Sequence, residues 1–88
     1  MSLKAPGEWT DEERRRVAIA IAEHRLSRVD LFLWQEADLK ARSARDLGVE
    51  LMLTPSAVRR RVDRARERLQ AAFDLPSQEA YLWKWLDT

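Results

Sequence analysis

Apolar residues recur along the chain at intervals of three and four positions, the spacing of one face of an α-helix. No stretch alternates apolar and polar residues in the way a half-buried strand does. With two glycines and three prolines in 88 residues, little interrupts the helical pattern. We therefore predict an all-α fold of about five short helices. The expected organisation is a flexible lead over residues 1–9, followed by one helical domain over residues 10–88.

Three segments begin with Ser or Thr followed three positions later by an acidic residue, which is the sequence pattern of a capping box at a helix N-terminus. They start at Thr10, Ser27 and Ser43. Thr54 and Pro55 mark a fourth start. Thr is a good N-cap, and Pro suits the first helical position because its missing N–H would have no partner there. The sequence therefore predicts four helix N-termini.

The apolar positions after each start predict the face that each helix buries. The first helix should run to about residue 25, with one side formed by Val17, Ile21 and His24. The inward residues of the second are Val29, Phe32, Leu33 and Ala37. Those of the third, over residues 44–51, are Ala44, Leu47, Gly48 and Leu51. Those of the fourth are Val58, Val62, Ala65, Leu69 and Ala72 or Phe73.

The third and fourth predicted helices are separated only by residues 52–54. Two helices joined by such a short turn form a helix-turn-helix, here over residues 44–69, whose second helix can enter the major groove of DNA. Gly48 would let the two helices approach closely. The angle between them would be filled by Leu47, Leu51, Leu53 and Val58.

The net charge of +1 conceals an uneven distribution. Residues 55–73 carry six basic and two acidic groups, whereas residues 74–88 carry one basic and three acidic groups. A concentration of positive charge in one segment favours an anionic partner there. Arginines on a long helix can also be merely solvated, with Asp63 and Glu67 as their helical partners.

Composition excludes several classes of site. The chain has no cysteine and a single histidine, so disulfides and thiolate metal sites are ruled out, and we expect no metal and no cofactor. No nucleophile and base fit a common helical register, so we expect no enzyme. No apolar run approaches the length that spans a bilayer, and we place the protein in the cytoplasm with no membrane partner. The sequence leaves open whether the chain forms a homo-oligomer.

The stretch "ARDLGVELMLTPSAVRRRVDRARERL" resembles region 4 of bacterial sigma-70-type factors, and is most similar to the extracytoplasmic-function branch. The family's Leu-Gly element corresponds to Leu47 and Gly48, and its Thr-Val-Lys-Ser-Arg-Leu element to residues 57–62. Its Ser-Arg-Ala-Arg run corresponds to residues 63–66. The resemblance covers roughly residues 26–73 and is most specific over residues 54–69.

The resemblance implies a bacterial or phage transcription regulator that binds the −35 promoter element with the second motif helix and contacts RNA polymerase. Its implied base-contacting residues are Ser56, Arg59, Arg60 and Asp63. Its implied phosphate-contacting residues are Lys40, Arg42, Thr54 and Arg64. Arginine suits base reading because it donates two hydrogen bonds to O6 and N7 of guanine. A whole sigma factor needs a further domain, so we expect a fragment or a stand-alone region-4-like regulator.

Met52 departs from the family, whose turn has a glycine at this position. If the residue there requires a positive φ, methionine costs about 1–2 kcal/mol relative to glycine. The alternative is a turn of another shape.

A second class of function is a protein-interaction or assembly module, either one that modifies polymerase or one that belongs to a phage structure, which keeps the fold without reading DNA. The final predicted helix, residues 77–86, favours it because Trp83 and Trp85 lie two positions apart and cannot share one helix face. One of them is then free to bind a partner, although either could instead complete a thin core. We expect Trp34 to belong to the core.

Overall fold

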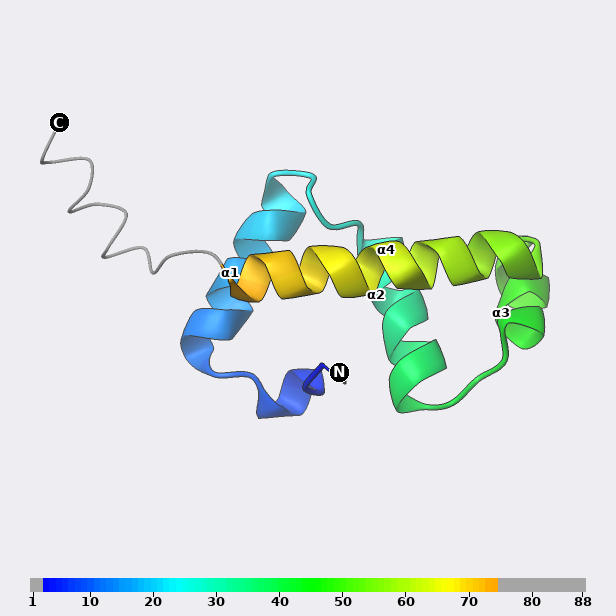
Figure 1. Ribbon diagram of the computed structural model, residues 1–88, viewed down its shortest axis with the longest axis horizontal. Coiled ribbons are helices and arrows are strands. Elements are labelled where there is room, and N and C mark those ends of the chain that lie inside the picture. Colours follow the sequence, from blue (N-terminus) through cyan, green and yellow to red (C-terminus); the bar gives the residue numbers. More distant parts are fainter. Residues whose placement is uncertain (1–2, 75–88) are drawn as a thin grey trace, which may run out of the picture.

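The computed structural model describes residues 3–74, and all regular structure within them is helical (Figure 1). Its elements are η1 (Pro6–Glu8), α1 (Asp11–Ala22), α2 (Arg28–Trp34), η2 (Gln35–Leu39), α3 (Ala44–Leu51) and α4 (Pro55–Phe73). The all-α prediction is confirmed, with four α-helices in this part of the chain. The predicted helix over residues 77–86 lies outside the described residues. No helix in the described range is long and apolar enough to cross a membrane.

Local capping explains where the helices begin. The Thr10 side chain accepts a hydrogen bond from the amide of Glu13, whose carboxylate accepts one from the amide of Thr10, so the capping box predicted at Thr10 is confirmed. Ser27 and Ser43 cap their helices through the hydroxyl alone, without the return bond to Asp30 or Asp46 that a full box requires. Ser43 and Thr54 accept hydrogen bonds from amides three positions later, and Pro55 is the first residue of α4. Each cap satisfies an N–H that has no partner inside its helix.

Helix α4 is the central element of the fold, and α1, α2 and α3 all pack against it (Figure 1). Its predicted apolar stripe is confirmed, because Val58, Val62, Ala65, Leu69 and Ala72 are buried. Figure 1 shows α3 beside the first turns of α4 and α1 beside its last turns. The orientation of α4 therefore depends on different neighbours at its two ends.

The core of the described residues consists of two clusters along α4. The cluster nearer α3 contains Leu33, Leu47, Val58 and Val62. The cluster nearer α1 contains Trp9, Val17, Ala20, Leu26, Trp34, Ala65, Leu69 and Ala72. Trp34 is 1% exposed and stacks on Trp9 with ring centroids 6.5 Å apart, which confirms that it is a core residue. Residues predicted as a flexible lead thus contribute an aromatic side chain to the core.

The inward face predicted for α2 is wrong in part. Val29 and Phe32 are 48% and 39% exposed, whereas Asp30, Leu33 and Trp34 are buried. The buried positions follow the spacing i, i+3, i+4 from an acidic residue, so a search for apolar residues alone selects the neighbouring face. Asp30 can be buried because Arg61 and Arg64 of α4 pair with its carboxylate.

The ends of three helical segments have left-handed backbone conformations at residues other than glycine. His24, Ala41 and Met52 have φ angles of 59°, 54° and 57°. The first helix accordingly ends at Ala22 rather than near residue 25. Non-glycine residues adopt this conformation at a cost, so the chain reversals after these helices are maintained against local strain.

Candidate nucleic-acid interface

The junction between α3 and α4 consists of residues 52–54, as the sequence predicts. The amide of Leu53 donates a 2.8 Å hydrogen bond to the carbonyl oxygen of Gly48, the pattern of a Schellman helix end. A Cβ atom at Gly48 would collide with the carbonyl oxygen of Leu53. Glycine is therefore required because the turn passes directly over the end of α3.

Met52 occupies the left-handed position of this turn, with φ 57° and ψ 43°, and is 93% exposed. The first of the two alternatives left by the sequence therefore holds, and methionine bears the conformational cost that a glycine would avoid. Its side chain gains little in return from packing, because it is almost fully exposed. The junction has the backbone conformation that glycine favours, without the glycine.

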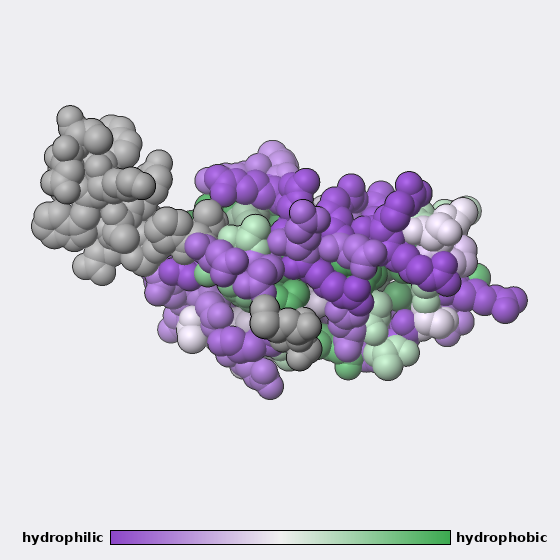
Figure 2. Space-filling view, in the orientation of Figure 1, coloured by the Kyte–Doolittle hydropathy of each residue, from purple (hydrophilic) through white to green (hydrophobic). Residues whose placement is uncertain are grey.

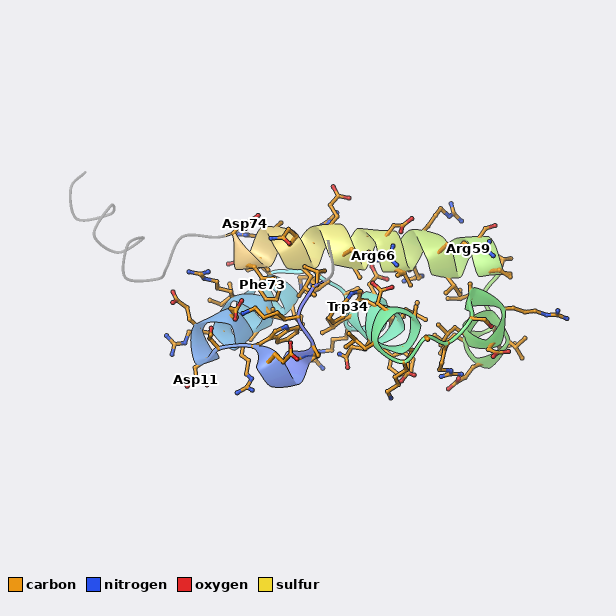
Figure 3. All side chains as sticks on the ribbon, turned by 60° about the horizontal axis from the view of Figure 1, so that its bottom comes forward. Asp11, Trp34, Arg59, Arg66, Phe73 and Asp74 are labelled. Carbon is orange, nitrogen blue, oxygen red and sulfur yellow. The ribbon has the colours of Figure 1, made fainter. Side chains whose placement is uncertain are left out.

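Four of the predicted contact residues lie in the first turns of α4 or just before it. The hydroxyl of Thr54 accepts a 3.1 Å hydrogen bond from the amide of Ala57, so this residue caps the helix. Ser56, Arg59 and Arg60 are exposed (Figure 3 shows Arg59 at the end of α4 nearest α3). Among residues 3–74, neither Arg59 nor Arg60 has a carboxylate partner, whereas Arg61 and Arg64 each have one and Arg66 has two.

Asp63, the fourth predicted base-contacting residue, accepts a 2.8 Å hydrogen bond from Arg66, one turn further along α4. The same arginine donates through Nε to Asp38 of η2, at 2.7 Å, and in Figure 3 Arg66 extends from α4 toward this part of the chain. Hydrogen bonding to Asp38 raises the pKa of Arg66, with a smaller contribution from Asp63. Arg66 thus links α4 to η2, and Asp63 remains 70% exposed in its side chain.

Arg64, predicted as a phosphate contact, is bound to the buried carboxylate of Asp30. Its Nε and Nη2 donate to the two carboxylate oxygens at 2.7 and 3.3 Å, and Arg61 donates to one of them at 3.0 Å. This pairing raises the pKa of Arg64, first through the hydrogen bonds and then through charge attraction. Asp30 is 2% exposed, whereas the Arg64 side chain is half exposed, and Arg64 uses only two of its five guanidinium N–H groups on this carboxylate.

Lys40 and Arg42, the other predicted phosphate contacts, lie between η2 and α3 and share the buried carboxylate of Glu36. Lys40 donates to one oxygen at 3.0 Å and Arg42 to the other at 3.5 Å, and Arg42 also pairs with Glu50 of α3. The hydrogen bond from Lys40 is the largest contribution to the lowered pKa of Glu36. Burial acts in the opposite direction and only partly offsets it. Both cations therefore support the loop that leads into α3.

The structure brings Ser56, Arg59, Arg60 and Thr54 together at the start of α4 and places Lys40 and Arg42 in a separate ion-pair group. Sequence reasoning missed the two buried acids, Asp30 and Glu36. A signal for Asp30 is present, since it occupies the same helical face as Leu33 and Trp34, where an acid has to be paired. The predicted partner-binding residues, Trp83 and Trp85, lie outside the described residues.

A shallow groove of about 590 Å³ lies between the end of α1 and the start of α2. It is lined mainly by small and apolar residues, including Ala18, Ile21, Ala22 and Val29, with Arg28 and His24 also present. Arg28 and Val29 are not on the α2 face that carries Asp30 and packs on α4. The groove is therefore a surface distinct from the start of α4.

Comparison with known proteins adds no relative: no family model matches this chain, and no curated protein or solved structure matches it either.

Proposed function

We propose that the chain binds duplex DNA through the first turns of α4 and acts as a transcription regulator similar to sigma factor region 4. The observation that carries the proposal is that Arg59 and Arg60, exposed near the start of the long helix α4, have no carboxylate partner among residues 3–74. Arginines that stabilise a fold are normally paired, as Arg61 and Arg64 are here. Two unpaired neighbours have hydrogen-bond donors available for base edges.

The chemistry of the neighbouring side chains supports base reading. Arg59 and Arg60 can each donate two hydrogen bonds to O6 and N7 of guanine. Ser56 can donate or accept, and Asp63 can accept a hydrogen bond from N4 of cytosine. Thr54 lies at the helix N-terminus, where the backbone N–H groups and the helix dipole favour a phosphate. Of the other implied phosphate contacts, Arg64 has a half-exposed guanidinium, and Lys40 is mostly exposed.

The α3–α4 junction supports the same proposal. Leu47 and Val58 pack together in the core at the junction, with Leu51 and Leu53 against them. The backbone turn over Gly48 fixes the two helices at close distance. In a DNA-binding helix-turn-helix, the first helix positions the second in the major groove. On this basis α3 positions α4, and RNA polymerase is the protein partner that the family resemblance implies.

The alternative, a protein-interaction module, is favoured by the groove between α1 and α2 together with the exposure of Phe32 and Val29. Exposed apolar groups beside a groove are typical of protein contact surfaces. This surface does not exclude DNA binding, because it lies away from the first turns of α4. If no duplex binds, this second function is the one to pursue.

Fluorescence anisotropy with duplexes selected from a random pool tests the proposal. We expect affinity to fall steeply as salt rises, because binding releases counterions from phosphates. Replacing both Arg59 and Arg60 by Ala should weaken binding to the selected duplex by at least about 10-fold, since each bidentate base contact contributes about 1–3 kcal/mol. Binding to unselected duplex should weaken less.

Arg15→Ala is the matched control, because Arg15 is exposed on α1 and its loss removes one charge elsewhere on the molecule. The proposal fails if no duplex is bound at low salt. It also fails as a proposal of base reading if the double variant loses the same factor on selected and unselected DNA.

A further inference from the structure

The two long flanks of α4 differ in charge. Successive residues of a helix are 100° apart, so Arg60, Arg61, Arg64 and Arg68 lie to one side of the buried stripe, and Arg59, Asp63 and Arg66 to the other. We name the first set the Asp30 flank, because Asp30 pairs with two of its arginines. The second set is the Asp38 flank, because Asp38 pairs with Arg66. Hydrophilic side chains cover the exposed length of α4 in Figure 2.

The count of charged groups makes one flank neutral and the other cationic. The Asp38 flank has two arginines opposed by Asp38 and Asp63, which gives a net charge of zero. The Asp30 flank has four arginines opposed by one buried carboxylate, which gives a net charge of +3. Glu67 lies between the two flanks. If its charge is assigned to the Asp30 flank, the net charge of that flank is still +2.

Arg68 extends the Asp30 flank beyond the first turns of α4. Its Nη1 donates a 2.9 Å hydrogen bond to the carbonyl oxygen of Arg25, in the connection between α1 and α2. This bond uses no carboxylate, so the full charge of Arg68 is retained at an exposed position. The hydrogen bond also fixes where that charge lies. Arg25 itself pairs with Glu23 and adds no net charge to the flank.

We propose that one strand of the bound duplex runs along the Asp30 flank, with its phosphates contacting Arg64 and Arg68 beyond the base-reading turns, and that the Asp38 flank does not contact the backbone. This proposal rests on the proposed function and specifies the orientation of α4 in the groove. Arg64 and Arg68 are four positions apart, which extends over about 6 Å of helix. One strand of DNA carries about two phosphates over that length of axis.

The salt dependence of binding tests Arg68, which the resemblance to sigma factors does not implicate. Each phosphate contact adds about 0.9 to the slope of log affinity against log salt concentration. Arg68→Ala should lower the slope by about that amount, so that between 50 and 200 mM salt the variant loses about 3-fold less affinity than the wild type. Arg68→Lys should keep the wild-type slope, because a phosphate contact needs the charge and not the hydrogen bond to Arg25.

Arg15→Ala is again the control, because it removes one charge that lies away from the proposed contact. Thermal unfolding by circular dichroism establishes that each variant is folded before its slope is used. If the wild type binds DNA and Arg68→Ala has the slope of Arg15→Ala, the orientation proposal is overturned while DNA binding stands. If the wild type binds no duplex, both proposals fail.

A tethered cleavage reagent gives an independent readout of orientation. The chain has no cysteine, so a single Ala71→Cys or Gln70→Cys substitution provides one attachment point. These neighbouring positions lie on the Asp30 side and the Asp38 side of α4, respectively. We expect an iron chelate at position 71 to cleave the selected duplex more strongly than one at position 70. Equal cleavage, or stronger cleavage from position 70, would overturn the proposal.

Discussion

The two halves of α4 pack on different neighbours through separate apolar clusters, and the roles of their arginines also differ. The first turns pack on α3 through Leu47 and Val58, and the turn over Gly48 fixes the junction. Among the described residues, Arg59 and Arg60 in these turns have no carboxylate partner. Farther along, buried and exposed carboxylates bind Arg61, Arg64 and Arg66. Arginines that are neighbours in the sequence therefore form two groups in the structure, those with a carboxylate partner and those without one.

The largest expected effect tests the ion-paired half. Asp30→Ala should lower the free energy of unfolding by about 3 kcal/mol, because it removes a buried carboxylate that accepts three hydrogen bonds from two arginines. Partial exposure of both guanidinium groups keeps the loss at the lower end of the range for a broken buried pair. Urea denaturation at neutral pH measures the change.

Asp63→Ala is the matched control, since it removes an exposed partner of Arg66 and should cost less than about 0.5 kcal/mol. Equal losses of unfolding free energy for the two variants would show that the buried pairs of Asp30 stabilise the fold no more than the exposed pair of Asp63. The division of arginines into two groups would then lose its basis.

The next effect tests the junction between α3 and α4. Gly48→Ala should lower the free energy of unfolding by about 2 kcal/mol, because the added methyl group meets the backbone carbonyl of Leu53, which cannot rotate away like a side chain. Urea denaturation of Gly7→Ala gives the control, since nothing lies within 4 Å of a Cβ at Gly7. The variant should also bind DNA more weakly than its stability loss explains, because α3 positions α4. Unchanged stability would contradict the close approach at this junction.

A smaller effect of opposite sign is expected at Met52. Met52→Gly should raise the free energy of unfolding by about 1 kcal/mol, because glycine adopts a positive φ without the steric cost of a side chain. The nearly complete exposure of Met52 means that little packing is lost. The midpoint of thermal unfolding measures the gain. Met52→Ala is the control, and it should show no such gain because alanine keeps the Cβ.

The smallest effect is expected on acidification, at the separate ion-pair group of Glu36, Lys40 and Arg42. The lowered pKa of Glu36 means that its paired, charged form stabilises the fold at pH values above about 4.5 and that this contribution is lost as pH falls through the lowered pKa. Stability of the wild type relative to Glu36→Gln should therefore be constant near neutral pH and decline below about pH 4.5. Urea denaturation of both proteins from pH 7 to pH 3 measures this difference. A constant difference over that range would show that Lys40 and Arg42 do not stabilise the charged form.

Much of the local structure could be predicted from the sequence because its causes are local. Thr10, Ser43 and Thr54 cap helices through amides three positions away, and Pro55 suits a first helical turn in any fold. The buried stripe of α4 follows from periodicity alone. The helix starts at Ser43 and Thr54 located the junction, and the structure decided between the two turn shapes that the sequence left open at Met52.

The partners of the arginines could not be predicted, because they depend on which distant segments share a face. Arg64 and Asp30 are 34 positions apart, and Arg66 and Asp38 are 28 apart. An exposed arginine and a paired one have the same sequence pattern, and only the packing of α2 and η2 on α4 distinguishes them. Local composition thus determined the helices and their caps. Tertiary structure determined which positive charges remain unpaired, because electrostatic pairing depends on distance in space and not on separation along the chain.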